Sequence, residues 1–343
     1  MTDKNWFETI FGFVETDKNI NKMFKLDTSN KKRISLYSKS NNTTFEIGSF
    51  ECISLNKLRK ITQCYKSGTS RMPIVNHIIT NDILKEHHKN PGALFQVASQ
   101  FNCLEMANPN NTPEYGITIY SYDRTQGPSC AIACAAATLY RNYFASTSNN
   151  NIGQTEHEQI NNLDKVEKIF DSSYFWLKNG YLFSDKKKMD DLNLIIDKHE
   201  DQIMSKVEFG LNLNTEVCFS DRFVKTKDKV LVSQIFCSAI SCSYSGIDNV
   251  RWEKLARIIL KSCYEATLLS AIYNRNNGGT NKVFLTFIGG GAFGNDIDWI
   301  IDAINYAIDS IRVYNSDLEI NICHYRRINE DIQSKIKKFR FNY

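Results

Sequence analysis

The chain has 343 residues, of which 42% are hydrophobic and 12% aromatic, so it contains enough apolar sequence for a packed globular core. Its net charge of +4 comes from interspersed acidic and basic residues, and no basic run is longer than the three residues of Lys186–Lys188, which argues against a nucleic-acid-binding surface. The sequence shows no leader-like start and no apolar run of membrane-spanning length, so we expect a soluble cytoplasmic protein that binds neither nucleic acid nor membrane.

The cysteines and histidines lack the spacing of a metal site or a disulfide framework. The ten cysteines include no CxxC pair, and the six histidines are scattered along the chain. Zinc sites need paired ligands at short spacing, and a chain of this size does not depend on disulfides for its stability. We therefore expect free thiols that pack as small apolar groups, no metal and no cofactor.

The first hundred residues combine short strands with helices. In chain order, the patterns predict strands at Ile34–Tyr37 and Thr44–Ile47, a helix at Leu55–Cys64, a helix at Asn76–His88 and a central strand at Leu94–Ala98. Pro91 and Gly92 separate the last two elements.

The middle of the chain continues this alternation. The patterns predict an alanine-rich helix at Ser129–Phe144, surface helices at Glu156–Ile169 and Lys188–Met204 on either side of the aromatic segment Tyr174–Phe183, strands at Thr215–Asp221 and Val230–Ser238, and a long helix at Val250–Asn274. Alternating strands and helices indicate a mostly parallel sheet with helices on both faces.

The most informative segment is VFLTFIGGGAFGNDIDWIIDAINYAI, at residues 283–308. Val283–Ile288 has the composition of a strand buried on both faces, and the isoleucines from Ile297 to Ile308 recur at helical spacing. The glycines between them let the backbone approach a ligand closely, and the following helix N-terminus favours negative charge. We therefore interpret Gly289–Asn295 as a phosphate-binding loop.

The same loop also matches GxGxxG, the motif of dinucleotide-binding Rossmann domains. That motif normally opens a large sheet, whereas only one predicted helix, Asp296–Ile311, and one predicted strand, Leu318–Tyr325, follow it here. No acidic residue ends that strand, and no GK[ST] closes the loop as in a Walker motif. A Rossmann domain and a purely structural turn stay open as alternatives.

A second candidate site lies in Phe95–Pro128, where the central strand ends and a loop leads to the alanine-rich helix. The polar side chains of this segment that could meet a ligand are Ser99, Gln100, Asn102 and Gln126, the last beside Gly127. In open α/β sheets, ligands bind beyond the carboxyl ends of the strands, so we expect this loop and the glycine loop to face one crevice. Tight helix packing is an alternative explanation for the alanines.

The order of these landmarks resembles the macrodomain superfamily. VASQFN at Val97–Asn102, a glycine before an alanine-rich helix, and the loop TFIGGGAFGN follow one another as the ligand loops of that family do. The phrases ASQFNCLE and YDRTQGPSCAIACAAATLYRNYF are similar to a divergent branch that includes a Legionella effector hydrolysing ADP-ribosyl-ubiquitin. The resemblance spans roughly residues 92–325.

The resemblance implies a three-layer α/β/α fold with a mixed, mostly parallel sheet and insertions. We expect a single domain over residues 1–343, with an N-terminal extension at 1–75 packed on it and an insertion at 145–215. It also implies a monomer that binds ADP-ribose or an ADP-ribosylated protein such as ubiquitin, in the host cytosol if the chain is a secreted bacterial effector.

By position, Asn102 corresponds to the last Asn of the first ligand loop, which contacts the distal ribose in the family. Gly127 corresponds to the glycine before the next helix, and Phe293 to the aromatic position of the diphosphate loop. The complete expected binding set is Ser99, Gln100, Asn102, Gln126, Gly127, Gly289, Gly290, Gly291, Ala292, Phe293, Gly294, Asn295 and Asp296.

Two departures from the family pattern affect this assignment. About 24 residues separate Asn102 from Gly127, so the first loop is much longer than usual and its register is open. Pro91, Gly92 and Ala93 stand where the family commonly has an adenine-reading Asp. Adenine would then be held otherwise, for example by stacking on Tyr174–Phe183, a segment that is equally compatible with a core role.

Cleavage of the bond between ADP-ribose and a side chain passes through an oxocarbenium-like transition state and needs a carboxylate. The candidates are Asp123, Glu265, Glu105 and Asp296. Asp123 leads because it precedes Gly127 in the first loop, although a loop Asp can equally cap a turn. Glu265 faces either the cleft or solvent, and Asp296 is better suited to cap its helix than to sit beside a diphosphate. Glu105 is the candidate that the sequence constrains least.

Three functions follow from these expectations. The first is a hydrolase that releases ADP-ribose from a modified protein side chain, arginine being the residue that the resemblance implies. The second is a binding module that recognises ADP-ribose without cleaving it. The third is a hydrolase of small ADP-ribose metabolites.

Overall fold

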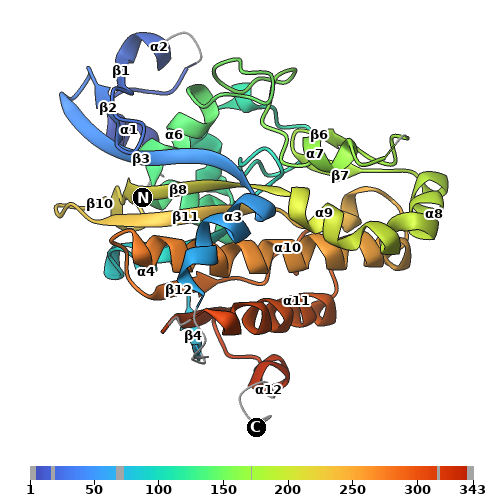
Figure 1. Cartoon of the computed structure of the whole chain (residues 1–343). Coiled ribbons are helices and arrows are strands. Elements are labelled where there is room, and N and C mark those ends of the chain that lie inside the picture. The colour runs from blue at the N-terminus through green and yellow to red at the C-terminus, as the bar shows by residue number, and fades with distance from the viewer. Residues whose placement is uncertain (1–4, 17–19, 67–72, 171, 315–316, 338–343) are drawn as a thin grey trace.

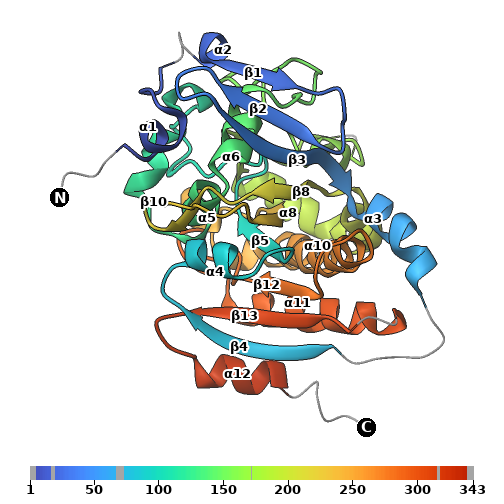
Figure 2. The ribbon, with the colours of Figure 1, turned by 90° about the vertical axis from the view of Figure 1, so that its left-hand side faces the viewer.

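The computed structural model describes residues 5–16, 20–66, 73–170, 172–314 and 317–337. Within these ranges, nine strands form one sheet in the order β1-β2-β3-β8-β11-β5-β12-β13-β4. Figure 2 shows this order from β1 at the top to β4 at the bottom. The strands are β1 (Phe24–Asp27), β2 (Ile34–Ser38), β3 (Thr43–Ser54), β4 (Ile74–Thr80), β5 (Leu94–Ala98), β8 (Glu208–Glu216), β11 (Leu231–Cys237), β12 (Lys282–Leu285) and β13 (Glu319–Tyr325).

The sheet has two halves that differ in strand direction. Strands β11, β5, β12, β13 and β4 run parallel to one another, whereas β1, β2, β3, β8 and β11 pair antiparallel. The carboxyl ends of β11, β5 and β12 therefore lie at one edge of the sheet, where α/β proteins place their ligands. The expected mixed sheet is confirmed, with its parallel pairings concentrated in the half that carries the candidate site.

Helices cover both faces of the sheet (Figure 1). On one face pack α3 (Leu55–Thr62), α8 (Lys186–Ile195), α9 (Glu200–Lys206), α10 (Asn249–Asn276) and α11 (Ile297–Ser310). On the other face pack α1 (Trp6–Phe11), α4 (Ile83–Lys89), α5 (Gln126–Ala133) and α6 (Ala135–Tyr143). Successive strand residues point to opposite faces, so Leu94 joins the first core and Phe95 the second. The expected α/β/α layering is confirmed.

Shorter elements complete the described chain. They are α2 (Ile20–Met23), α7 (Asp164–Glu167), α12 (Glu330–Lys337), the hairpin of β6 (Trp176–Lys178) with β7 (Tyr181–Phe183), and the ribbon of β9 (Phe219–Asp221) with β10 (Val224–Lys225). The 3-10 helices are η1 (Gln63–Tyr65), η2 (Pro113–Tyr115), η3 (Thr118–Tyr122), η4 (Ile196–His199), η5 (Cys242–Tyr244) and η6 (Ile311–Val313). No helix in the described ranges is both long and apolar enough to cross a bilayer.

The N-terminal strands β1 to β3 continue the main sheet through the pairing of β3 with β8. Residues 145–215 contribute the β6–β7 hairpin, α7 to α9 and most of β8. The division of the chain into an extension, a core domain and an insertion stays a prediction.

The predicted helix at Asn76–His88 is wrong in its first half. Residues Ile74–Thr80 form edge strand β4, and helix α4 begins only at Ile83, where the Asp82 carboxylate accepts a hydrogen bond from the Leu84 N–H. Val75, Ile78 and Ile79 are β-branched, a composition that favours a strand, and pairing with β13 provides the hydrogen bonds.

The predicted helix at Ser129–Phe144 is divided at Cys134, which has φ −108° and ψ 55°. The carbonyl of Ala133 accepts a hydrogen bond from the N–H of Cys218, so a distant segment takes an acceptor that a continuous helix would use. In Lys188–Met204 the helix is likewise interrupted, by η4, and of Glu156–Ile169 only Asp164–Glu167 is helical. Within that last segment, the N–H groups of Ile160 and Leu163 donate to the side chains of Gln154 and Asn161, which competes with helix formation.

Candidate functional site

A pocket of about 240 Å³ lies beyond the carboxyl ends of β5, β11 and β12. Its lining comes from the loops after these three strands, from the start of α5 and from β7. The lining residues are Ala98, Ser99, Gln100, Glu105, Met106, Ala107, Asp123, Thr125, Gln126, Gly127, Pro128, Tyr181, Ala239, Tyr244, Thr286, Phe287, Ile288, Gly289, Gly291, Ala292 and Phe293. The two loops that the sequence predicted to share a crevice therefore meet in one cavity.

The pocket opens where β5 and β12 part. Their pairing covers only Leu94 and Phe95 of β5, and beyond these residues the side chain of Gln126 takes the place of the missing strand partner. The Gln126 carboxamide accepts a hydrogen bond from Ala98 N–H (2.8 Å) and donates one to the Gln96 carbonyl (2.7 Å). Gln126 thus fastens the N-terminus of α5 to β5, and both of its polar atoms are used within the protein.

Gly127 shows how closely α5 approaches this strand. A Cβ atom at residue 127 would lie 2.0 Å from the carbonyl oxygen of Ala98 and 3.2 Å from Cγ of Glu105. Only glycine fits there, and the N-terminus of α5 is held at the wall of the pocket as a result.

The loop after β5 is closed by its own amide side chains. Gln100 accepts a hydrogen bond from the Met106 N–H and donates to the Met106 carbonyl, at 2.9 and 3.1 Å. Asn102 accepts from the Leu104 N–H and donates to Gln159, and it does not line the pocket. Gln100 and Asn102, both predicted as ligand contacts, thus shape the turn that carries Glu105.

In the glycine loop, the N–H groups of Gly290, Gly294 and Asn295 donate to backbone carbonyls of the loop or of Phe287. Within the described ranges, the N–H groups of Gly289, Gly291, Ala292 and Phe293 make no hydrogen bond, and all four residues line the pocket. Gly289 has φ +76°, which favours glycine. A run of free N–H groups in a concave loop suits an anion such as a diphosphate.

Three residues of the predicted loop, together with Asp296, lie outside the lining: Gly290, Gly294 and Asn295. Asn295 donates a hydrogen bond to the Ile240 carbonyl at 2.7 Å and ties the loop to the segment after β11. The carboxylate of Asp296 accepts a hydrogen bond from the Asp298 N–H and caps α11.

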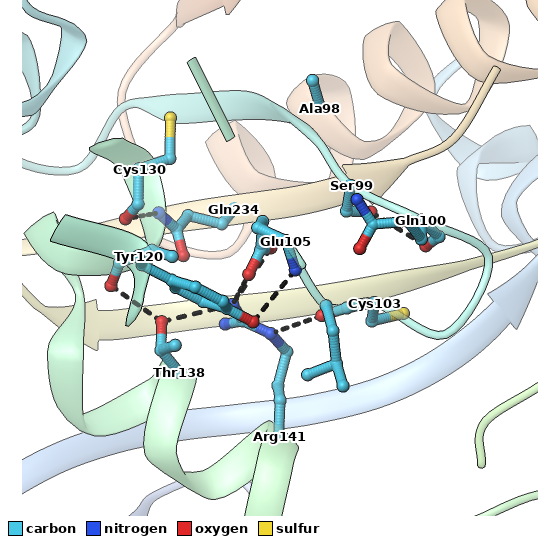
Figure 3. Close-up of polar contacts among 12 residues, drawn as sticks. Ala98, Ser99, Gln100, Cys103, Glu105, Tyr120, Cys130, Thr138, Arg141 and Gln234 are labelled. Carbon is cyan, nitrogen blue, oxygen red and sulfur yellow. Dashed lines mark hydrogen bonds and ion pairs between the residues drawn. The ribbon is translucent and has the colours of Figure 1, made fainter. Parts of the chain in front are cut away.

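Glu105 is the buried acid of the pocket, with 2% of its surface exposed. Figure 3 shows its carboxylate facing Arg141, which rises from α6. One terminal nitrogen of Arg141 lies 3.2 and 3.3 Å from the two carboxylate oxygens, and Nε donates to the Cys103 carbonyl at 3.0 Å. The Glu105 N–H donates to the hydroxyl of Tyr120 at 3.0 Å, so backbone and side chain are both fixed.

Burial raises the pKa of Glu105 to about 7, although the charge of Arg141 opposes the shift. The ion pair is long and uses a single guanidinium nitrogen, so it offsets the loss of hydration only in part. A carboxyl group that exchanges its proton near neutral pH can act as a general base or a general acid.

An aromatic cluster stands at one side of the pocket. Tyr181 of β7, Tyr244 of η5 and Phe293 of the glycine loop have ring centroids 5.1 to 5.8 Å apart. Tyr181 belongs to the aromatic segment predicted for stacking, and its hydroxyl donates to the Met106 carbonyl. The cluster provides an apolar wall that a flat ring could contact.

The two other acids predicted as catalytic differ in whether they reach the pocket. Asp123 lines the pocket, is half-buried, and accepts a hydrogen bond from the Thr125 N–H at 2.8 Å in a local turn. Glu265 does not line the pocket, because its side chain points from α10 to Arg59 of α3, at 2.6 and 2.8 Å. The preceding residue, Tyr264, points instead to the base of the glycine loop and bonds Thr286 and Ile288.

Sequence reasoning missed Arg141, Tyr120 and Tyr244. Arg141 is the only charged residue of α6, in a helix of mostly small and aromatic residues, and a buried arginine at such a position must find an acid in the core; this signal could have directed attention to Glu105. Tyr120 and Tyr244 occur in 3-10 turns without a periodic pattern, so nothing in the sequence marks them. The described ranges hold no group of three or more His, Cys, Asp or Glu able to bind a metal.

Neither the family models nor the curated proteins compared with the chain include a match. Solved structures similar to it include the poly(ADP-ribose) glycohydrolase from Thermomonospora curvata, with 10% identity, a TM-score of 0.46 and 97% of each chain covered. The same protein bound to the inhibitor ADP-HPD has 10% identity, a TM-score of 0.46 and 98% of each chain covered. The poly(ADP-ribose) glycohydrolase from Deinococcus radiodurans in complex with ADP-ribose has 8% identity and a TM-score of 0.44, over 84% of this chain and 92% of that one.

Proposed function

We propose that the chain is a macrodomain-type ADP-ribosylhydrolase that cleaves the glycosidic bond between ADP-ribose and a protein side chain. One observation supports this most strongly: the free N–H groups of the glycine loop, the N-terminus of α5 and the buried acid Glu105 line the same pocket. The first two bind the diphosphate, and the third provides proton transfer beside it. The aromatic cluster of Tyr181, Tyr244 and Phe293 receives the adenine base.

In the proposed reaction, Glu105 accepts a proton from a water molecule while the water oxygen bonds C1″ of the ribose. The bond from C1″ to the side-chain nitrogen breaks, and its electron pair leaves with that nitrogen. The proton passes from Glu105 to the leaving group, so that free ADP-ribose and an unmodified side chain result. Arg141 stabilises the ionised form of Glu105, and the diphosphate loop fixes the position of the ribose.

We further propose that the acceptor is arginine, as on ubiquitin, in line with the sequence resemblance to the branch of the Legionella effector MavL. Glu105 and Asp123 are the only charged side chains among the described residues that line the pocket. An acidic lining without Lys or Arg favours a cationic acceptor group, whereas the diphosphate is met by neutral N–H groups. Asp123 stands at the half-exposed part of the lining, where it can attract the guanidinium.

The proposal is tested with ubiquitin or peptides carrying one ADP-ribose on arginine, serine or glutamate. We expect release of ADP-ribose to be fastest from arginine. Asp123→Asn should slow that reaction about tenfold and change the binding of free ADP-ribose little, because it removes only the attraction for the guanidinium. The exposed Asp228 outside the pocket supplies the matched control, Asp228→Asn, which should leave the rate unchanged.

Calorimetry with free ADP-ribose separates the hydrolase from the alternative, a binding module without catalysis. Heat of binding without release from any of the three linkages would favour the binding module. Absence of any binding would reject both functions.

A further inference from the structure

Glu15 is about 90 residues before the pocket residue Glu105 in the chain, yet its carboxylate accepts hydrogen bonds from Ile117 and Thr118, in the loop between β5 and α5 that lines the pocket. It accepts hydrogen bonds from the N–H groups of Ile117 and Thr118, at 2.9 and 2.7 Å. The Thr118 hydroxyl and the Tyr143 hydroxyl donate to it as well, at 2.6 and 2.8 Å. Four donors from two other parts of the chain therefore converge on this one carboxylate.

These donors include the N-terminus of the 3-10 helix η3. The residue before η3, Ile117, provides no side-chain cap, so the carboxylate of Glu15 caps the helix across 103 residues of sequence. A negative charge at a helix N-terminus satisfies the free N–H groups and interacts favourably with the peptide dipoles. Trp6 of α1 adds a hydrogen bond from its indole to the Thr118 carbonyl, at 3.0 Å.

The preceding turn is shaped around the same carboxylate. Gly116 has φ +77°, and a Cβ atom there would lie 2.7 Å from the carboxyl carbon and from one oxygen of Glu15. Glycine thus permits both the left-handed backbone and the close approach of Glu15.

Helix η3 connects this anchor to the acid of the pocket. Its residue Tyr120 is 1% exposed and holds the N–H of Glu105 through its hydroxyl. The next residue after η3 is Asp123, which lines the pocket and donates its N–H to the Tyr120 carbonyl. Both acids of the pocket are therefore held by a helix whose first turn depends on Glu15.

We propose that Glu15 is a positioning residue, which anchors η3 so that Tyr120 holds Glu105 and Asp123 in place. This role rests on the proposed function for its effect on turnover, but the anchoring itself is independent of any activity. The N-terminal segment would then complete the pocket from outside it, while the glycine loop, which Glu15 does not touch, keeps its affinity for the diphosphate.

Hydrogen–deuterium exchange of the full chain tests the anchoring directly. In Glu15→Ala, the amides of Ile117, Thr118 and Glu105 should exchange about tenfold faster or more, because charge-assisted hydrogen bonds of the first turn are lost. Amides of α10 should keep their protection. Glu8→Ala, which removes an exposed carboxylate of α1, is the matched control and should leave all these rates unchanged.

Tyr143→Phe removes only one of the four contacts and provides a milder variant if Glu15→Ala fails to fold. It should raise exchange at the same three amides by a smaller factor. Unchanged exchange at these amides in a folded variant would overturn the anchoring role.

With an arginine-linked substrate, Glu15→Ala should lower kcat about tenfold and change the Kd for ADP-ribose less than about threefold. A larger loss of ADP-ribose binding would contradict a role confined to η3. If the wild-type protein neither binds nor releases ADP-ribose, the proposed function fails, whereas the exchange experiment still decides the role of Glu15.

Discussion

Two buried carboxylates of this molecule are each paired with an arginine, yet their surroundings differ. Glu105 lies at the pocket and meets a single nitrogen of Arg141 at 3.2 and 3.3 Å. Glu265 lies between α10 and α3, where Nε and a terminal nitrogen of Arg59 contact it at 2.6 and 2.8 Å and Tyr306 adds a hydroxyl at 3.2 Å. Both carboxylates are at most 5% exposed.

The comparison shows that burial and an arginine partner are not enough to select a candidate catalytic acid. The oxygens of Glu265 are occupied by a two-pronged ion pair and a hydroxyl, so the group serves to join α3 and α11 to α10. Glu105 has a weaker partner and borders a cavity, and burial raises its pKa to about 7. Access to a cavity, combined with incomplete pairing, distinguishes Glu105 from Glu265.

The largest effect that separates the two acids concerns turnover. Glu105→Gln should lower release of ADP-ribose by a factor on the order of 10³, since the isosteric amide cannot take the proton of water. Glu265→Gln should keep the rate within about threefold, because its site does not reach the pocket. A single-turnover assay measures both rates, and circular dichroism confirms that both variants are folded. A large loss in Glu265→Gln with a small loss in Glu105→Gln would contradict the comparison.

The next effect concerns stability. Arg141→Met leaves Glu105 buried without a counter-charge and should lower the free energy of unfolding by about 3 kcal/mol at pH 8. Arg59→Met should cost about 1–2 kcal/mol, because the Arg59 side chain is 29% exposed and water can replace part of the interaction. Urea unfolding of both variants measures the difference, and an equal loss would show that the two pairs are energetically alike.

The third effect is a pH dependence of stability to which Glu105 should contribute. Its folded-state pKa of about 7 lies above its unfolded value near 4.5, so the folded state binds more protons between these pH values. The contribution is fully present below the unfolded pKa and is lost as pH rises through about 7, by roughly 3 kcal/mol in all. Glu105→Gln should flatten this part of the unfolding free-energy profile, and a profile unchanged in that variant would contradict the assignment.

Much of the fold could be predicted from local patterns. The central strand Leu94–Ala98 is a short, mostly apolar run, the long helix after Val250 has apolar residues at helical spacing, and the structure places both as expected. The helix predicted at Asn76–His88 is wrong in its first half because a β-branched strand followed directly by a helix has an apolar pattern that resembles one longer helix. Pairing with β13 stabilises the first part as a strand.

In the candidate site, too, the features that depend on local sequence were predictable and those that depend on distant contacts were not. The glycine loop and the turn at Gly127 could be identified from the sequence alone, because each depends on backbone freedom within a few residues. Whether Glu105 or Glu265 lines the pocket depends on packing between distant segments. The side chains of Glu105 and Glu265 differ by what packs against them from α6 and α3, and contacts between segments so distant in sequence leave no local pattern along the chain.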